Sequence, residues 1–248
     1  MKKTLRNILL AGTITLASLF PMKKVLAQPQ ENPKPKINIS VAGNLANKSR
    51  FWGMPFLDSP VYTQSLNANY GNFSASIAGD VDVNNKKLFN MQTHTGFFQP
   101  LSKTISFHLG YVFFNFNLGE GWDYASILYG GLAADLPLNP SVTYNRLFRF
   151  GGGEYIEGSV SHAFPLGEKI GISLSQKAGY NNKAGRDKTG FSHLETGVSV
   201  PIQLSNRVNI TPYLNYLHSL SDEVKSGFYG GINVNYPLLK TKKPAIQK

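Results

Sequence analysis

The chain has 248 residues, with 25 lysine and arginine residues against 14 aspartate and glutamate residues, and it contains no cysteine. The lack of cysteine excludes both a disulfide framework and a lipidated N-terminal cysteine. The basic excess lies at the two ends of the chain, so we predict no nucleic-acid partner.

The first 27 residues have the parts of a secretory signal. Three basic residues fall within the first six positions, an apolar run follows from 8 to 20, and Ala27 ends a stretch of small or apolar residues. An apolar run of about 13 residues is too short to cross a bilayer as a helix, which needs about 20. We therefore predict export with cleavage after Ala27. An amphipathic anchor that is not removed is the alternative.

The remaining chain divides into three parts. Residues 28–36 are rich in proline and polar side chains, which favours an extended leader without a core of its own. Residues 37–238 contain no internal linker and are predicted to form one domain. Residues 239–248 are predicted to be a basic tail.

Alternation of apolar and polar residues dominates the central region. Within 73–83, for example, Phe73, Ala75 and Ile77 alternate with serine residues. A period of two places one set of side chains on each face of a β-strand. The pattern predicts twelve strands of roughly 9 to 13 residues, long enough to cross a membrane when tilted, near 37–45, 61–70, 73–83, 89–98, 104–115, 123–135, 141–149, 155–164, 170–180, 192–201, 208–217 and 227–236.

The connections between these strands alternate in length. Short turns follow every second strand, and the longer, more polar loops lie at the opposite strand ends. An even number of strands with short turns at one end and aromatic residues near strand ends is typical of bacterial outer-membrane β-barrels. We therefore predict an all-β fold: a transmembrane antiparallel up-and-down barrel of about twelve strands, embedded in outer-membrane lipid.

A soluble β-sandwich or lipocalin-like barrel is the alternative to this fold. The polar face is rich in serine, asparagine and glycine, whereas the outer surface of a soluble sheet usually carries many lysine and glutamate residues. This composition favours the membrane barrel.

Two segments carry a resemblance to known families. The last predicted strand, Tyr229 to Tyr236, resembles the C-terminal signal read by the outer-membrane assembly machinery, although a twelve-residue tail follows it here. The stretch 104–238, with runs such as Leu128-Tyr129-Gly130-Gly131-Leu132, is similar to TorF-type and related uncharacterised porins. The first resemblance implies that machinery as a partner, and the second implies a porin-like architecture.

Several charged and polar side chains are expected to point into the barrel, because charges are costly on the lipid side. Glu157 and Lys177 should lie almost opposite each other on neighbouring strands. The expected lumen-lining residues are Asp80, Asp82, His94, His108, Glu157, Lys177, Glu195 and Asn233.

The polar residues indicate no catalytic centre. The histidines lack the short spacing of a metal motif, and we expect no metal, cofactor or catalytic residue. A lipid hydrolase that uses His162 with Ser159 or Ser161 is an alternative for which the sequence offers little support, since serine and asparagine are abundant.

The favoured function is a passive channel for small polar solutes, and a structural or adhesive barrel with a plugged lumen is the alternative. The aromatic loop 46–60 bears on this choice. It can fold into the lumen, rest on the membrane or bind a ligand, and the sequence does not decide among these.

Overall fold

The structure is a computed structural model that describes residues 37–239 apart from 53, 118–120, 150–151 and 186. The predicted signal (1–27), the predicted leader (28–36) and residues 240–248 of the predicted tail lie outside the described residues. In the part that is described, no helix is long and apolar enough to cross a membrane.

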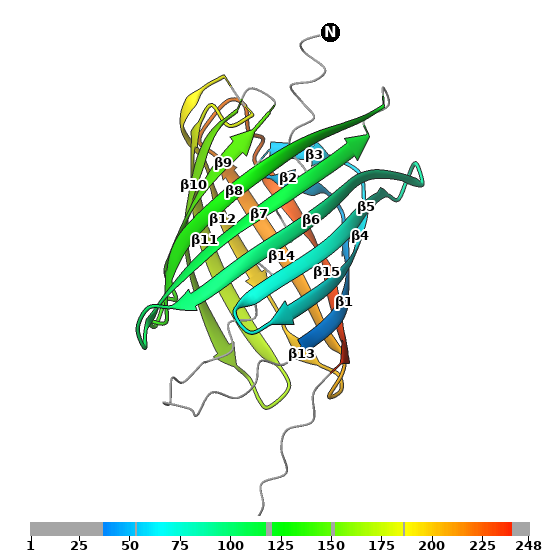
Figure 1. Ribbon diagram of the computed structural model, residues 1–248, viewed down its shortest axis with the longest axis vertical. Helices are drawn as coiled ribbons and strands as arrows, with labels where there is room; N and C mark the ends of the chain where they lie inside the picture. Colours follow the sequence, from blue (N-terminus) through cyan, green and yellow to red (C-terminus); the bar gives the residue numbers. More distant parts are fainter. Residues whose placement is uncertain (1–36, 53, 118–120, 150–151, 186, 240–248) are drawn as a thin grey trace, which may run out of the picture.

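Twelve long strands form the wall of a barrel (Figure 1). They are β1 (Ile37–Ala46), β4 (Val61–Tyr70), β5 (Phe73–Asp82), β6 (Lys87–Pro100), β7 (Ile105–Asn117), β8 (Trp122–Ala134), β9 (Ser141–Phe148), β10 (Gly153–Pro165), β11 (Gly171–Asn182), β12 (Thr189–Ser199), β14 (Asn209–Ser219) and β15 (Gly227–Leu239). Each pairs antiparallel with the next wall strand, and β15 pairs with β1, so the wall closes on itself. The predicted all-β, antiparallel, twelve-stranded up-and-down barrel is confirmed.

The two ends of the barrel differ in their connections. One end, here called the turn end, carries the short connections 71–72, 101–104, 135–140, 166–170 and 200–208. The other, called the loop end, carries 47–60, 83–86, 118–121, 149–152, 183–188 and 220–226. At the turn end Gly71 has a φ of 59°, a left-handed conformation that glycine adopts without strain and that suits a two-residue hairpin.

Three short strands were not predicted from the sequence. Strands β2 (Ser49–Phe51) and β3 (Met54–Leu57) form a hairpin inside loop 47–60, and β13 (Ile202–Gln203) lies in a turn-end connection. They are too short for a period of two to stand out from the sequence.

The last strand extends beyond its predicted end at Tyr236. Pro237 pairs with Ser40 and Leu239 with Ile39, and the register shifts between Ile39 and Ser40. Proline cannot donate to a ladder, and it is tolerated next to such an irregularity.

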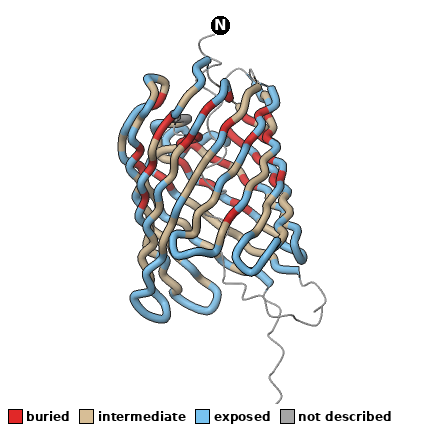
Figure 2. Tube along the Cα trace, turned by 90° about the vertical axis from the view of Figure 1, so that its left-hand side faces the viewer, coloured by how far each residue is buried: buried red, intermediate tan, exposed pale blue. Residues whose placement is uncertain are grey.

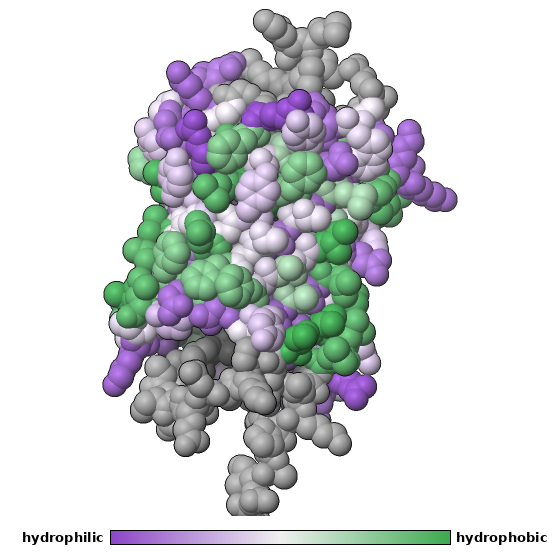
Figure 3. Space-filling model, viewed as in Figure 1, coloured by the Kyte–Doolittle hydropathy of each residue, from purple (hydrophilic) through white to green (hydrophobic). Residues whose placement is uncertain are grey.

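The outer face of the wall is apolar. Leu66, Leu128 and Leu174 point outward with 43–48% of their surface exposed, and hydrophobic side chains gather across the middle of the surface in Figure 3, with hydrophilic ones towards both ends. Aromatic side chains pair across strands near the strand ends, with centroid separations of 5.1 Å for Phe73–Phe97, 5.7 Å for Phe113–Tyr124, 5.5 Å for Tyr180–Phe191 and 4.7 Å for Tyr216–Phe228. An apolar belt with aromatic margins suits a bilayer.

The interior is packed unevenly along the barrel axis. Figure 2 shows that buried residues concentrate in the half next to the loop end, whereas the other half is mostly intermediate or exposed. Among the described residues, the interior is therefore closely packed in the half next to the loop end and less closely packed in the half next to the turn end.

Candidate functional site

The turn-end half of the interior is lined by small polar side chains. Their partial exposure, together with the strand alternation, places on the inner face Ser40, Asn67, Ser74, Ser76, Ser106, Thr143, Ser159, Ser161, Ser173, Ser175 and Asn235. Short hydroxyl and amide side chains leave space and offer hydrogen bonds to a polar solute.

His94 and His108 lie on this inner face beside Tyr129. His94 Nε2 hydrogen-bonds to the Tyr129 hydroxyl, and the two rings stack with centroids 5.6 Å apart. His108 Nε2 lies 3.2 Å from Thr143 Oγ1. Both histidines are thus part of the hydrogen-bonded wall.

Asp80 and Asp82 point inward, but each is engaged by neighbours. Asp80 is buried and accepts hydrogen bonds of 2.6 Å from both Thr63 and Asn90. Asp82 accepts a hydrogen bond of 3.1 Å from Ser59 and further ones from residues of the 83–86 loop. These carboxylates brace β5 and the loop end.

Three charged side chains meet near the middle of the barrel. Lys177 is directly paired with Glu195 across β11 and β12, and Lys177 Nζ lies 3.7 Å from Glu195 Oε1. Glu157 faces Gly179, and Lys177 faces Ser159, so Glu157 and Lys177 lie on neighbouring strands as predicted, but as diagonal neighbours and not directly opposite each other. The predicted strands end at 164 and begin at 170, whereas β10 ends at Pro165 and β11 begins at Gly171, which shifts the pairing by two residues.

Asn233, the last of the predicted lumen residues, faces Asn44 on β1 and Thr211 on β14. The Tyr213 hydroxyl donates a 3.3 Å hydrogen bond to Asn44 Oδ1. The seam where the first and last strands close the barrel is therefore polar on its inner side.

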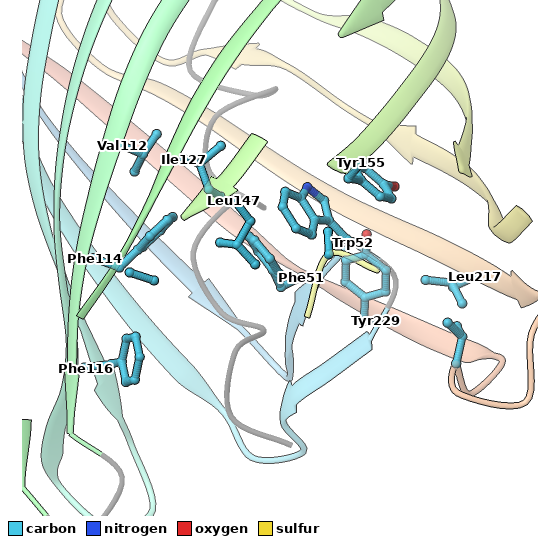
Figure 4. Packing of buried hydrophobic residues seen from close by; sticks show 13 residues of the cluster. Phe51, Trp52, Val112, Phe114, Phe116, Ile127, Leu147, Tyr155, Leu217 and Tyr229 are labelled. Carbon is cyan, nitrogen blue, oxygen red and sulfur yellow. The ribbon is translucent and has the colours of Figure 1, made fainter. Parts of the chain in front are cut away.

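The loop-end half is filled by the β2–β3 hairpin, which the sequence could not place. Phe51 and Trp52 are 2% and 7% exposed and enter the interior. Trp52 stacks on Tyr155 with centroids 4.6 Å apart and an interplanar angle of 18°, and Phe51 meets Phe114 edge-on at 6.2 Å. Figure 4 shows both hairpin side chains surrounded by residues of the wall.

The wall residues around the hairpin form an apolar collar. On the loop-end part of β7, the inward and the outward side chains are both large and apolar. The sequence analysis did not predict the inward ones. The collar consists of Val112, Phe114, Phe116, Ile127, Leu147, Tyr155, Leu217 and Tyr229. We call Phe51 and Trp52 with this collar the aromatic plug.

No protein-family model and no curated protein matches the sequence. Among solved structures, the KdgM porin has a TM-score of 0.54 at 12% identity, covering 79% of this chain and 98% of that one. The NanC porin has a TM-score of 0.52 at 12% identity, covering 80% and 98%. A structure of the KdgM porin in complex with disordered oligogalacturonate gives 0.53 at 10% identity, covering 80% and 98%. The chain has the fold of an outer-membrane porin.

The porin fold fixes the surroundings of the site. A closed barrel with an apolar outer face belongs in the bacterial outer membrane, because its described strands pair with one another around the whole wall and leave no open sheet edge. In such barrels short turns face the periplasm and longer loops face the cell exterior. The aromatic plug therefore lies on the exterior side.

The hydrolase set considered from the sequence does not assemble on the porin wall. His162 points outward, meets Phe164 edge-on and hydrogen-bonds to the Pro137 carbonyl, whereas Ser159 and Ser161 occupy inward positions. Consecutive residues of a strand point to opposite faces. The three side chains therefore cannot act together.

A serine and a histidine do meet elsewhere in the barrel. Ser192 Oγ lies 2.9 Å from His193 Nδ1 and donates a hydrogen bond to the Gly179 carbonyl at 3.0 Å. The hydroxyl proton is thus directed at a carbonyl and not at the imidazole, and both side chains are buried at a register shift. We assign this pair to packing. Among the described residues, no group of three or more histidine, cysteine or acidic side chains is placed to hold a metal ion.

Two loops of the loop end are joined by an ion pair. Lys188 donates a hydrogen bond to Asp222, and this bond and the positive charge of Lys188 lower the pKa of Asp222. The loops border an open groove of about 380 Å³. Both side chains are exposed, so the pair adds little to stability.

Proposed function

We propose that the chain is an outer-membrane channel for small polar solutes, narrowed at its exterior side by the aromatic plug. One observation carries this proposal: a closed porin fold whose turn-end half is lined by short polar side chains and remains partly exposed. A twelve-stranded barrel is wide enough to be either open or filled by side chains. Among the described residues, the side chains that fill the interior are concentrated in the loop-end half.

We do not propose the ligand of the KdgM porin as the solute of this chain. KdgM is described with oligogalacturonate, a chain of sugar carboxylates, whereas the charged side chains inside this barrel are mostly acidic. We therefore propose small neutral or cationic solutes in place of an acidic oligosaccharide.

A plugged structural or adhesive barrel is the second candidate. It is favoured by the burial of Phe51 and Trp52, which fills the loop-end half with apolar side chains. If the plug never opens, the polar half is a closed vestibule.

Conductance and solute flux distinguish the two candidates. Purified protein, folded in detergent, is inserted into planar bilayers and into liposomes that are challenged with small neutral sugars. A channel gives discrete conductance steps and sugar-driven swelling. Absence of both, for protein that shows heat-modifiable migration on gels, contradicts the channel and supports the plugged barrel.

We also propose that the assembly machinery reads the segment Tyr229 to Tyr236 within β15. Its outward residues Ile232, Val234 and Tyr236 alternate with inward polar residues, and the strand forms one side of the closing seam. The continuation of β15 to Leu239 means that this segment is internal to the strand.

A further inference from the structure

Acidic side chains dominate the charged residues of the barrel strands. The only lysine and arginine residues of the twelve wall strands are Lys87, Arg146 and Lys177, and the acidic ones are Asp80, Asp82, Asp123, Glu154, Glu157 and Glu195; the β2–β3 hairpin adds Arg50. This balance is the reverse of the whole chain, whose formal charge is +11.

Two of the three basic residues do not reach the interior. Lys87 is the exposed first residue of β6 at the loop end. Arg146 points outward on β9, where its Nη1 lies 2.8 Å from Glu154 Oε1. Lys177 is thus the one cation that the described barrel strands place on the inner face away from the rim.

Lys177 is the one cation beside two carboxylates, those of Glu157 and Glu195. It forms an ion pair with Glu195 at 3.7 Å, and Glu195 is also hydrogen-bonded to the Tyr229 hydroxyl. Glu157, by contrast, is partly exposed and forms no hydrogen bond or ion pair with the described residues. Its interaction with Lys177 and Glu195 is electrostatic only. The three side chains carry one net negative charge when all are ionised.

Glu157, Lys177 and Glu195, here called the acidic cluster, lie next to the aromatic plug, where their net charge acts on a passing solute. Glu157 lies two residues from Tyr155, on which Trp52 stacks, so the cluster lies immediately on the turn-end side of the aromatic plug. A solute that passes the plug passes these carboxylates at close range. Charges in a confined pore raise the local concentration of ions of the opposite sign.

From this arrangement we infer that Glu157, Lys177 and Glu195 form a cation-selective constriction, with Glu157 supplying the unpaired carboxylate. The inference rests on the proposed channel function and names the solute class that the channel favours: small cations and cationic organic solutes over anions. Asp80 is hydrogen-bonded to Thr63 and Asn90, and Asp82 to the 83–86 loop, so we do not assign them this role.

The reversal potential across a planar bilayer in a tenfold KCl gradient tests the inference. We expect the wild-type channel to favour K⁺ over Cl⁻, and Glu157→Gln to lower the permeability ratio about threefold, as for one unit charge within a few ångströms of the ion path. Glu157→Asp should keep the preference, and Lys177→Met should raise it.

The matched control is Glu168→Gln, which removes the same charge from an exposed residue of the turn-end connection 166–170. It should leave the permeability ratio unchanged, and heat-modifiable migration verifies that every variant folds. Open channels that favour Cl⁻, or a Glu157→Gln ratio equal to that of wild type, overturn the cation-selective constriction and leave the channel standing. Absence of any conductance overturns the channel itself, and the inference falls with it.

Discussion

At the scale of single residues, the inner wall depends on glycines that make room for aromatic rings. Tyr129 lies directly across from Gly110, and a Cβ added at Gly110 would stand 2.2 Å from the Tyr129 hydroxyl and 2.6 Å from the Thr95 carbonyl oxygen. The same relation holds between Tyr213 and Gly231. These rings can lie against the wall because the neighbouring strand has no side chain there.

We predict that Gly110→Ala lowers the free energy of unfolding by about 1–3 kcal/mol, the usual cost of overpacking a tight site. The added methyl group meets backbone as well as the ring, so rotation of Tyr129 alone does not relieve it. Urea unfolding of the folded protein in lipid, followed by tryptophan fluorescence, measures the change.

Gly158→Ala is the matched control for this substitution. Gly158 also lies in a barrel strand, but a Cβ there has no atom within 4 Å. Its free energy of unfolding should stay within about 0.5 kcal/mol of wild type. If both variants lose the same free energy of unfolding, the loss comes from replacing a strand glycine in general and not from the contact with Tyr129.

At the scale of secondary-structure elements, Phe51 and Trp52 attach the β2–β3 hairpin to the interior of the barrel. Arg50 adds a 3.5 Å hydrogen bond to the Lys225 carbonyl. Contacts with the collar bury the side chains of Phe51 and Trp52 almost completely, and such burial stabilises by about 25 cal/mol per Å². The plug is therefore sensitive to truncation of these two side chains.

We predict that Trp52→Ala increases single-channel conductance, because it removes the ring stacked on Tyr155 and opens space at the narrow end. Planar bilayer recordings measure the step size. Trp122→Ala is the control, since Trp122 is 48% exposed at the outer margin of β8, and its loss should leave the step size unchanged. A Trp52→Ala step no larger than that of wild type would show that the hairpin does not limit the current.

The wall strands were predictable from sequence because one face of each meets lipid and the other meets polar groups, which produces a period of two. The aromatic plug was not, because the period fails where both faces are apolar. Along Val112-Phe113-Phe114, the middle side chain faces lipid and its two neighbours point inward as part of the collar. The sequence of loop 46–60 shows its aromatic residues but no partner for them, since Tyr155 and Phe114 come from distant strands.

The charged cluster shows a similar limit. Alternation alone places Glu157, Lys177 and Glu195 on one face of their strands, but which of them meet depends on register. Register follows from the lengths of the strands and turns, and the sequence gives strand ends only to within a few residues. Lys177 pairs with Glu195 on the following strand, a contact that the sequence analysis did not single out.

At the scale of the whole molecule, the closed barrel separates an apolar exterior from a polar interior along every strand. The chain contains no cysteine, so single cysteines can be placed at chosen positions without background labelling. On β11, Ser173 and Ser175 point inward and Leu174 points outward. Neighbouring residues of a strand lie at nearly the same depth in the membrane but on opposite faces of the wall. Their labelling therefore reports which face is in contact with water.

We predict that Ser173→Cys and Ser175→Cys react with a small water-soluble thiol reagent in protein reconstituted into liposomes, whereas Leu174→Cys does not. A spin label at residue 174 should instead be relaxed by oxygen dissolved in the bilayer. Heat-denatured samples, in which all three cysteines must react, give the reference for complete labelling. Equal reactivity of the three folded variants would contradict a lipid-facing outer wall, and protection of all three would mean that the interior is closed to water from the turn end as well.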